Sequence, residues 1–191
     1  LIEQGADLGS HRARQLGLYD EWYRWRLRHR LQAYAVERDF ADVPEGHPAY
    51  EAVMGLARMG VFRGLSPERF GATDRADLGT VAVVISRALA LLPDVPAPAA
   101  VPELPERLSG QWWSGAVAEM VARGVLPAES LDTLDANAFV TPDELRGYLQ
   151  SAFEDCGELP PLPPELLSDG AVTRAGLALL LWECIPQGEA Y

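Results

Sequence analysis

The chain has 191 residues, of which 48% are hydrophobic and 23% are charged, a composition that is ordinary for a globular protein with a sizeable core. Its 28 acidic residues outnumber 16 basic ones and give a formal net charge of −12, which argues against a nucleic-acid partner. The longest apolar runs, at residues 81–92 and 175–182, are shorter than the roughly 20 residues of a membrane-spanning helix, so no membrane span is predicted. The sequence begins without a recognisable targeting signal.

Residues 1–38 are predicted to form an Arg-rich helical segment. Between residues 16 and 34 the large apolar side chains recur at steps of three and four, which places them on one helical face. Two interpretations stay open. Either the helix docks on the acidic remainder of the chain with its arginines solvated, or these arginines bind a polymer or a partner together with Trp22 and Trp25.

Residues 39–92 read as a unit of two helices. The first helix is predicted over residues 49–59, with Pro48 in its first turn and Gly60 in the left-handed conformation that ends many helices. Asp77 is the expected N-cap of the second helix, which is predicted to end near Leu91.

The unit recurs in residues 106–154, after a Pro-rich linker at residues 93–105. An offset of 64 positions places residues 52–62 on 116–126 without a gap, which marks an internal repeat. The second helix of this unit opens with a predicted capping box between Thr141 and Glu144, with Pro142 between them. We expect the two helices of each unit to pack together about a shared axis and to bury eight residues: Leu56, Ala57, Val84, Ile85, Met120, Val121, Tyr148 and Leu149.

A partial third unit is predicted at residues 155–191. An offset of 32 positions places Thr173 on Thr141, and the apolar stretch that follows reads as the second helix of a unit. The stretch between Phe153 and Thr173 is too short for a full first helix and loop. Either this unit is truncated, or the N-terminal helix supplies its missing half.

The two cysteines fall near the ends of consecutive predicted helices. Cys184 lies near the end of the last helix, and Cys156 lies just past the end of the helix before it. Parallel neighbouring helices would bring these positions within the distance of about 7 Å that a disulfide requires. The sequence leaves open both a disulfide and two buried thiols that pack as small apolar residues.

The repeated pattern resembles the S-layer homology family. It reads Phe-Ala-Asp-Val-Pro at residues 40–44, then a helix that ends in Gly-Val-Phe at residues 60–62, then Phe70 ahead of the second helix. The resemblance covers about residues 40–185. It implies an all-α fold in which tandem two-helix units pack as a pseudo-threefold helical prism. It also implies a bacterial cell surface, where grooves between units bind pyruvylated or other anionic secondary cell-wall polysaccharide.

The resemblance implies a ligand-gripping Arg after the first residue of the tetrapeptide that opens each second helix. That position holds Leu78 in the first unit, Pro142 in the second and Arg174 in the third. Because an Arg side chain takes a carboxylate with two parallel hydrogen bonds, we expect Arg174 and Thr173 to bind the ligand and at most one groove to be competent. Arg174→Ala is expected to abolish binding and leave the melting temperature nearly unchanged. The alternative is that Arg174 binds a neighbouring carbonyl or an acid.

The family's aromatic residue in the first helix is present as Trp112, together with its neighbour Trp113. Adjacent side chains cannot point the same way. We expect one of them in the core and the other exposed, where it stacks on a sugar ring or on another domain.

No enzyme activity, cofactor or metal site is predicted, because His11, His29 and His47 are far apart and the notable acids have capping roles. The sequence predicts a module of a bacterial cell-surface protein that binds cell-wall polysaccharide non-covalently, in the cell wall or S-layer. The alternative is a degenerate structural or docking domain of a larger secreted protein or enzyme, which has lost glycan binding and contacts another domain or protein of the cell surface.

Overall fold

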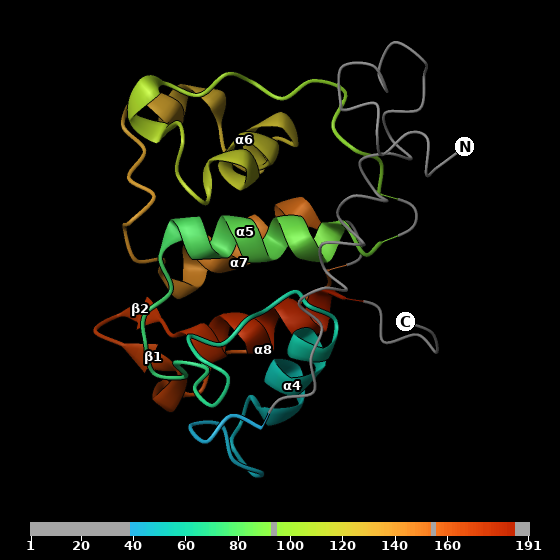
Figure 1. The fold of residues 1–191 in the computed structure, drawn as a ribbon, viewed down its shortest axis with the longest axis vertical. Helices are drawn as coiled ribbons and strands as arrows, with labels where there is room; N and C mark the ends of the chain where they lie inside the picture. The colour runs from blue at the N-terminus through green and yellow to red at the C-terminus, as the bar shows by residue number, and fades with distance from the viewer. Residues whose placement is uncertain (1–38, 93–94, 154–155, 186–191) are drawn as a thin grey trace.

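The computed structural model describes residues 39–92, 95–153 and 156–185, and the segment predicted at residues 1–38 lies outside them. Within these ranges the chain is mostly helical, as predicted (Figure 1). The helices are α4 (Tyr50–Arg58), α5 (Leu78–Leu89), α6 (Ser114–Ala122), α7 (Pro142–Ala152) and α8 (Arg174–Cys184). The connections contain the short 3-10 helices η1 (Glu106–Leu108), η2 (Ala128–Asp132) and η3 (Pro164–Leu166) and an antiparallel hairpin of β1 (Leu167–Ser168) and β2 (Ala171–Val172). No helix in the described ranges has the length and apolar character needed to cross a membrane.

The C-terminal ends of α4 and α6 carry the same hydrogen bonds. After α4, the N–H of Gly60 donates to the carbonyl of Ala57 (3.0 Å) and the N–H of Val61 donates to the carbonyl of Leu56 (2.9 Å). Gly60 has a φ of +72°, the left-handed conformation in which glycine carries no steric penalty. The same pair of bonds recurs 64 positions later at Gly124, Val121, Val125 and Met120.

The starts of α5, α7 and α8 share a second geometry, in which the N-cap side chain accepts a backbone N–H three residues further on. The distances are 2.7 Å for Asp77, 3.4 Å for Thr141 and 3.1 Å for Thr173. Thr141 also forms the predicted capping box with Glu144. These caps satisfy N–H groups that a helix leaves without an internal partner.

Three helix boundaries differ from the prediction by one or two residues, and one of them is the end of α4 at Arg58 rather than at residue 59. Pro48 precedes α4 rather than lying in its first turn, because a turn closed by the N–H of Tyr50 and the carbonyl of His47 comes before the helix. α5 ends at Leu89 rather than near Leu91.

Directly before the three N-caps, main-chain hydrogen bonds close into a ring. The N–H of Ala76 donates to the carbonyl of Val172 (2.8 Å), the N–H of Val172 to Val140 (2.9 Å), and the N–H of Val140 to Ala76 (3.0 Å). All three residues are buried. Positions 76, 140 and 172 are equivalent under the offsets of 64 and 32, so the ring joins the same position of each unit.

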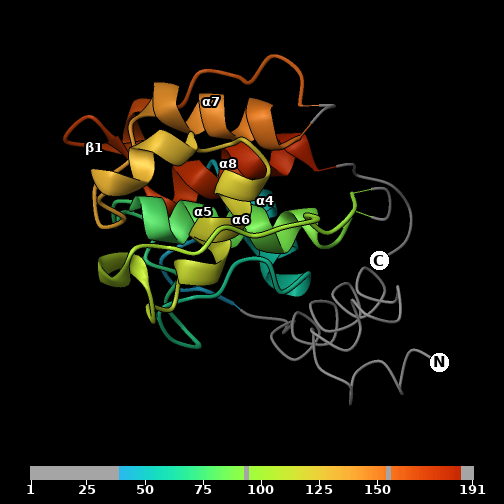
Figure 2. The same ribbon diagram turned by 90° about the horizontal axis from the view of Figure 1, so that it is seen from above.

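The largest helix contacts in the described ranges join different units. α6 packs on α5, and α4 packs on α8 (Figures 1 and 2). The expectation that the two helices of one unit pack mainly on each other is therefore wrong. Each loop between the helices of a unit is held by its own buried residues, such as Phe70 and Leu134, and this carries the second helix away from the first.

The two interfaces differ in their chemistry at equivalent positions. Between α4 and α8, Trp182 packs on Gly55 so closely that a Cβ there would lie 2.2 Å from the indole ring. Between α5 and α6 the same positions hold Ser86 and Glu119, and the Ser86 hydroxyl donates to the Glu119 carboxylate (2.5 Å). Arg123 donates to the other carboxylate oxygen at 2.7 Å, which pairs this buried charge.

Six of the eight predicted core residues are buried, each with at most 3% of its surface exposed, and two are not. Val121 and Tyr148 are half-buried and pack against the core from its edge. The six buried residues are Leu56, Ala57, Val84, Ile85, Met120 and Leu149.

The third unit lacks a first α-helix within the described ranges. The chain passes from α7 to α8 through η3 and the hairpin, and the carbonyl of Pro160 accepts a hydrogen bond from Arg146 on α7 (3.2 Å). α7 has two fully buried residues, against nine in α5 and seven in α8. Its residues Asp143, Gly147 and Gln150 are exposed, which makes this a helix that is covered on one side.

A disulfide joins Cys156 and Cys184, whose Cα atoms are 4.5 Å apart. It ties the segment after α7 to the last residue of α8. The third unit is thereby closed by a covalent bond at the end opposite the ring of main-chain hydrogen bonds.

We predict that Leu56→Ala and Leu149→Ala each lower the free energy of unfolding by about 2–5 kcal/mol, because both side chains are fully enclosed and leave cavities. Urea unfolding followed by circular dichroism measures this. Gln150→Ala, next to Leu149 and exposed, is the control and should change little. A loss as small as that of the control would contradict the core assignment.

The disulfide predicts that the unfolded, unreduced protein contains no free thiols. Reduction should lower the free energy of unfolding by roughly 3 kcal/mol, because the bond closes a loop between residues 28 positions apart. Thiol titration in denaturant decides the first point, and two free thiols per chain would end the assignment.

Candidate functional site

The start of α8 docks on the loop between α4 and α5, and we name this contact the Arg174 junction (residues 173–175 against residues 62–75). The N–H of Arg174 donates to the carbonyl of Asp74 (2.8 Å), and the N–H of Ala175 donates to that of Ala72 (3.2 Å). Thr173 forms an antiparallel bridge with Arg75. The first turn of α8 thus uses its free N–H groups to hold the first unit.

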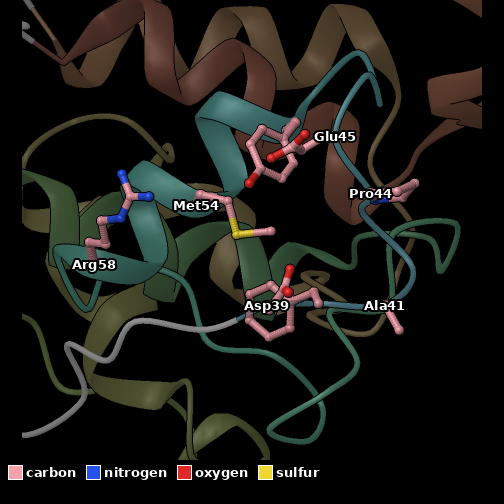
Figure 3. Close-up of a pocket in the computed structure, with 8 residues that line it drawn as sticks. Asp39, Ala41, Pro44, Glu45, Met54 and Arg58 are labelled. Carbon is pink, nitrogen blue, oxygen red and sulfur yellow. The ribbon is translucent and has the colours of Figure 1, made fainter.

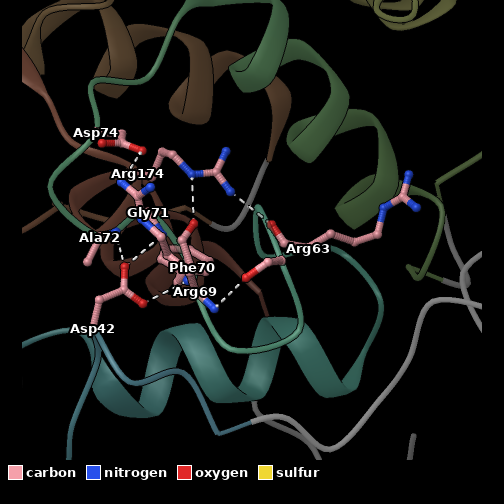
Figure 4. Close-up of polar contacts among 9 residues, drawn as sticks. Asp42, Arg63, Arg69, Phe70, Gly71, Ala72, Asp74 and Arg174 are labelled. Carbon is pink, nitrogen blue, oxygen red and sulfur yellow. Dashed lines mark hydrogen bonds and ion pairs between the residues drawn. The ribbon is translucent and has the colours of Figure 1, made fainter.

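The Arg174 guanidinium is held in a fixed position at this junction (Figure 4). Its Nε donates to the carbonyl of Phe70 (3.1 Å) and its Nη2 to the carbonyl of Arg63 (2.8 Å). The rings of Phe62 and Phe70 lie 5.0 and 5.2 Å from the guanidinium carbon, within the range of a cation–π contact. Because these contacts join two units, we now expect Arg174→Ala to lower the melting temperature, which revises the expectation from the sequence.

Burial lowers the pKa of Arg174, and the nearby carboxylates of Asp74, Asp77 and Asp42 act in the opposite direction. An Arg side chain remains protonated in proteins despite such a shift. The junction therefore presents a positive charge with restricted access to water.

Asp42 holds the same loop from the other side. Its carboxylate accepts hydrogen bonds from the N–H groups of Phe70 (2.7 Å), Gly71 (2.7 Å) and Ala72 (2.8 Å). Burial raises the pKa of Asp42, but the bonds from Ala72, Phe70 and Gly71 together outweigh it, and the pKa is lowered. Gly71 has a φ of +83°, and a Cβ there would lie 2.8 Å from Asp74, so the turn requires glycine.

An equivalent contact joins the first unit to the second, where α5 begins. The N–H of Leu78 donates to the carbonyl of Ala138 (3.0 Å) and that of Gly79 to Ala136 (2.8 Å). These are the same two bonds, with the acceptors 64 positions later and the donors 96 positions earlier than at the Arg174 junction. Leu78 is buried. The side chain that replaces Arg174 here is thus an apolar residue in the core.

Arg107, which the sequence analysis did not single out, holds the loop of the second unit. It donates to the carbonyl of Leu134 (2.7 Å) and to that of Leu131. Leu134 is the equivalent of Phe70, so the equivalent carbonyl of each loop accepts a hydrogen bond from a guanidinium. The two arginines that donate, Arg174 and Arg107, come from different places in the chain. The repeat offset of 64 positions gives a sequence signal for this role, because it places Arg107 on Val43, which is fully buried in the first unit.

The two tryptophans occupy opposite environments. Trp113 is 5% exposed and packs on Gly79, where a Cβ would lie 2.7 Å from the indole ring, whereas Trp112 is 66% exposed. Of the two, only Trp112 presents its ring to solvent. Trp112 precedes α6 and Arg174 begins α8, and Figure 1 shows these helices on opposite sides of α5.

Thr173 is 1% exposed, and its hydroxyl is used within the fold. It donates to the carbonyl of Leu166 (3.0 Å) and accepts from the N–H of Gly176 (3.1 Å). The structure thus gives Thr173 the role of a buried helix cap beside Arg174.

Both arginines and carboxylates surround the Arg174 junction. Arg63 and Arg69 both lie on the loop that Arg174 contacts (Figure 4). Arg69 pairs with Asp74 at 3.4 Å, an exposed contact of small energetic value. In the described ranges, no group of three or more His, Cys, Asp or Glu residues is arranged to hold a metal ion.

We predict that Asp42→Asn destabilises the protein by about 2 kcal/mol at neutral pH, because hydrogen bonds to a charged acceptor are lost. The folded pKa of Asp42 lies below its unfolded value, so its stabilisation is present above the unfolded pKa of about 3.9 and is lost as the pH falls through the folded pKa. Urea unfolding between pH 7 and pH 2 should show the difference from wild type shrinking. Asp39→Asn, in the same segment but exposed, is the control, and a pH-independent difference would contradict the prediction.

Comparison with known proteins matches residues 39–77 to the family model of the S-layer homology domain. The matched range covers α4, the loop and the N-cap of α5, which includes Asp42 and the loop that Arg174 contacts. No curated protein matches the chain. Domains of this family are modules that anchor proteins at the cell surface to the cell wall. Residues 39–77, which run to the N-cap of α5, are therefore similar to the S-layer homology domain family.

Proposed function

We propose that the chain is a module of a bacterial cell-surface protein that binds secondary cell-wall polysaccharide non-covalently at the Arg174 junction. The observation that carries the proposal is the fixed Arg174 guanidinium between two units. Its Nε and Nη2 are held by carbonyls, and Nη1 makes no hydrogen bond with a described residue. This nitrogen is suited to a carboxylate on the polymer.

The proposed arrangement is a pseudo-threefold helical prism of units at residues 39–92, 106–154 and 155–191, with residues 93–105 as a linker. The ring of hydrogen bonds at positions 76, 140 and 172 supports it, since it joins equivalent positions of the three units. The repeated bonds of the two junctions support it further. Each junction would then form a groove between units. Of the two junctions, only the Arg174 junction has an Arg at the start of the helix that forms it, because the start of α5 holds Leu78.

An extracellular location is proposed for the module. The disulfide between Cys156 and Cys184 favours it, because such bonds persist in oxidising surroundings outside the cytosol.

The test is co-sedimentation with purified acidic wall polysaccharide, comparing wild type with Arg174→Lys and Arg174→Ala. We expect Arg174→Ala to lose binding and Arg174→Lys to bind more weakly, because Lys keeps the charge but not the planar fork. Arg146→Ala, on exposed α7, is the control. Circular dichroism at the assay temperature shows that each variant is folded.

The second candidate is a degenerate docking domain that has lost glycan binding. The buried Leu78 and the Pro142 at the two other helix starts favour it, as do the carbonyl contacts that already use most of Arg174. A folded wild-type protein that does not sediment with the polymer would decide for this candidate. Full binding by Arg174→Ala would instead show that the polymer binds away from Arg174.

A further inference from the structure

A cavity lies in the first unit, away from the Arg174 junction. It has a volume of about 700 Å³ and lies between α4 and the segment that precedes it (Figure 3). Tyr50, Met54 and Arg58 line one wall, and their spacing of four residues forms one stripe of α4. Asp39 and Glu45 also line the cavity. This volume falls within the range of small-molecule sites.

The backbone around the cavity is fixed by local hydrogen bonds. The N–H of Val43 donates to the carbonyl of Phe40, and the N–H of His47 donates to the carbonyl of Pro44, both at 2.9 Å. Asp42, between these turns, is held by three N–H groups of the loop. Gly46 has a φ of +89°, which aims the second turn back toward α4. The site is therefore preformed, and a ligand need not order the wall.

The side chains that line the cavity combine an apolar floor with polar groups that have no partner among the residues that the structure describes. Tyr50 is half-buried and offers apolar ring surface, whereas Met54 lines the cavity but is only 3% exposed and adds little to that surface. Within the described ranges, the side chains of Asp39, Glu45 and Arg58 make no hydrogen bond or ion pair with another residue. Two carboxylates accept hydrogen bonds, and one guanidinium donates them.

We propose that this cavity binds an uncharged saccharide unit. A sugar ring presents hydroxyl groups at its edge and C–H groups on its face, which match the two carboxylates, the guanidinium and the apolar floor. Two acids against one Arg leave a negative excess, which disfavours an acidic sugar. The site thus selects the opposite chemistry to the Arg174 junction, and it does not depend on Arg174.

The three methionines of the chain allow a direct test by NMR with ¹³C-labelled methionine methyl groups. Uncharged disaccharides of glucose, mannose, galactose and N-acetylglucosamine are the probes. At least one of them should shift the Met54 methyl signal saturably and leave that of Met120, buried in the second unit, unchanged. If no probe moves the Met54 signal, or if Met120 moves as much, the proposal is overturned.

Variants separate this site from the proposed function. Asp39→Asn combined with Glu45→Gln should lower the affinity for the saccharide at least tenfold, because both charged acceptors are lost. Both residues are exposed, so the double variant should keep its fold. Glu51→Gln, exposed on α4 but outside the cavity, is the matched control. Arg174→Lys should retain the Met54 shift even where polymer binding is reduced. An unchanged affinity in the double variant would overturn the assignment to this cavity.

Discussion

Three main-chain hydrogen bonds among Ala76, Val140 and Val172 bring the starts of α5, α7 and α8 to one place. Because these groups are buried, breaking one bond leaves an unsatisfied polar pair in the core, so the three starts are held together or not at all. The N-caps follow at the next residue of each unit, and in the first and third units the junction hydrogen bonds begin at the one after, at Leu78 and Arg174. The position of Arg174 over the loop of the first unit is therefore a consequence of where the ring places the first turn of α8.

The two guanidinium contacts show how one backbone requirement is met from different places in the sequence. The loop carbonyls at Phe70 and Leu134 are equivalent, and each accepts a hydrogen bond from an Arg. In the first loop the donor comes from another unit, so the contact joins units. In the second loop Arg107 comes from the same unit, and the start of α5 is free to hold the apolar Leu78 in the core. The start of α5 thus lacks an Arg, and Arg107 of the second unit donates the hydrogen bond to the loop carbonyl in its place.

Much of the local structure could be predicted from the sequence, because it depends on neighbouring residues. Gly60 as a helix end and Thr141 with Glu144 as a capping box are examples. The pairing of helices could not be predicted, since α6 buries the same face whether it packs on α5 or on α7. The site was predicted in part: Arg174 was identified, but its carbonyl partners at Phe70 and Arg63 lie more than 100 positions away and leave no periodic signal. Arg107 lies only 24 and 27 positions from its partners, and its signal is the offset of 64 that places it on the buried Val43.

The difference between the two helix interfaces bears on how a repeated sequence avoids pairing with itself incorrectly. If α6 took the place of α4 against α8, the carboxylate of Glu119 would meet the indole of Trp182 and lose both Ser86 and the space that Gly55 provides. If α4 took the place of α6, Gly55 would leave a void beside Ser86. Either exchange is penalised, by a steric clash and a lost buried hydrogen bond or by lost packing. One helix interface is thus polar and the other apolar at equivalent positions. This difference specifies the partner of each helix, so that the repeated segments assemble in a single order during folding.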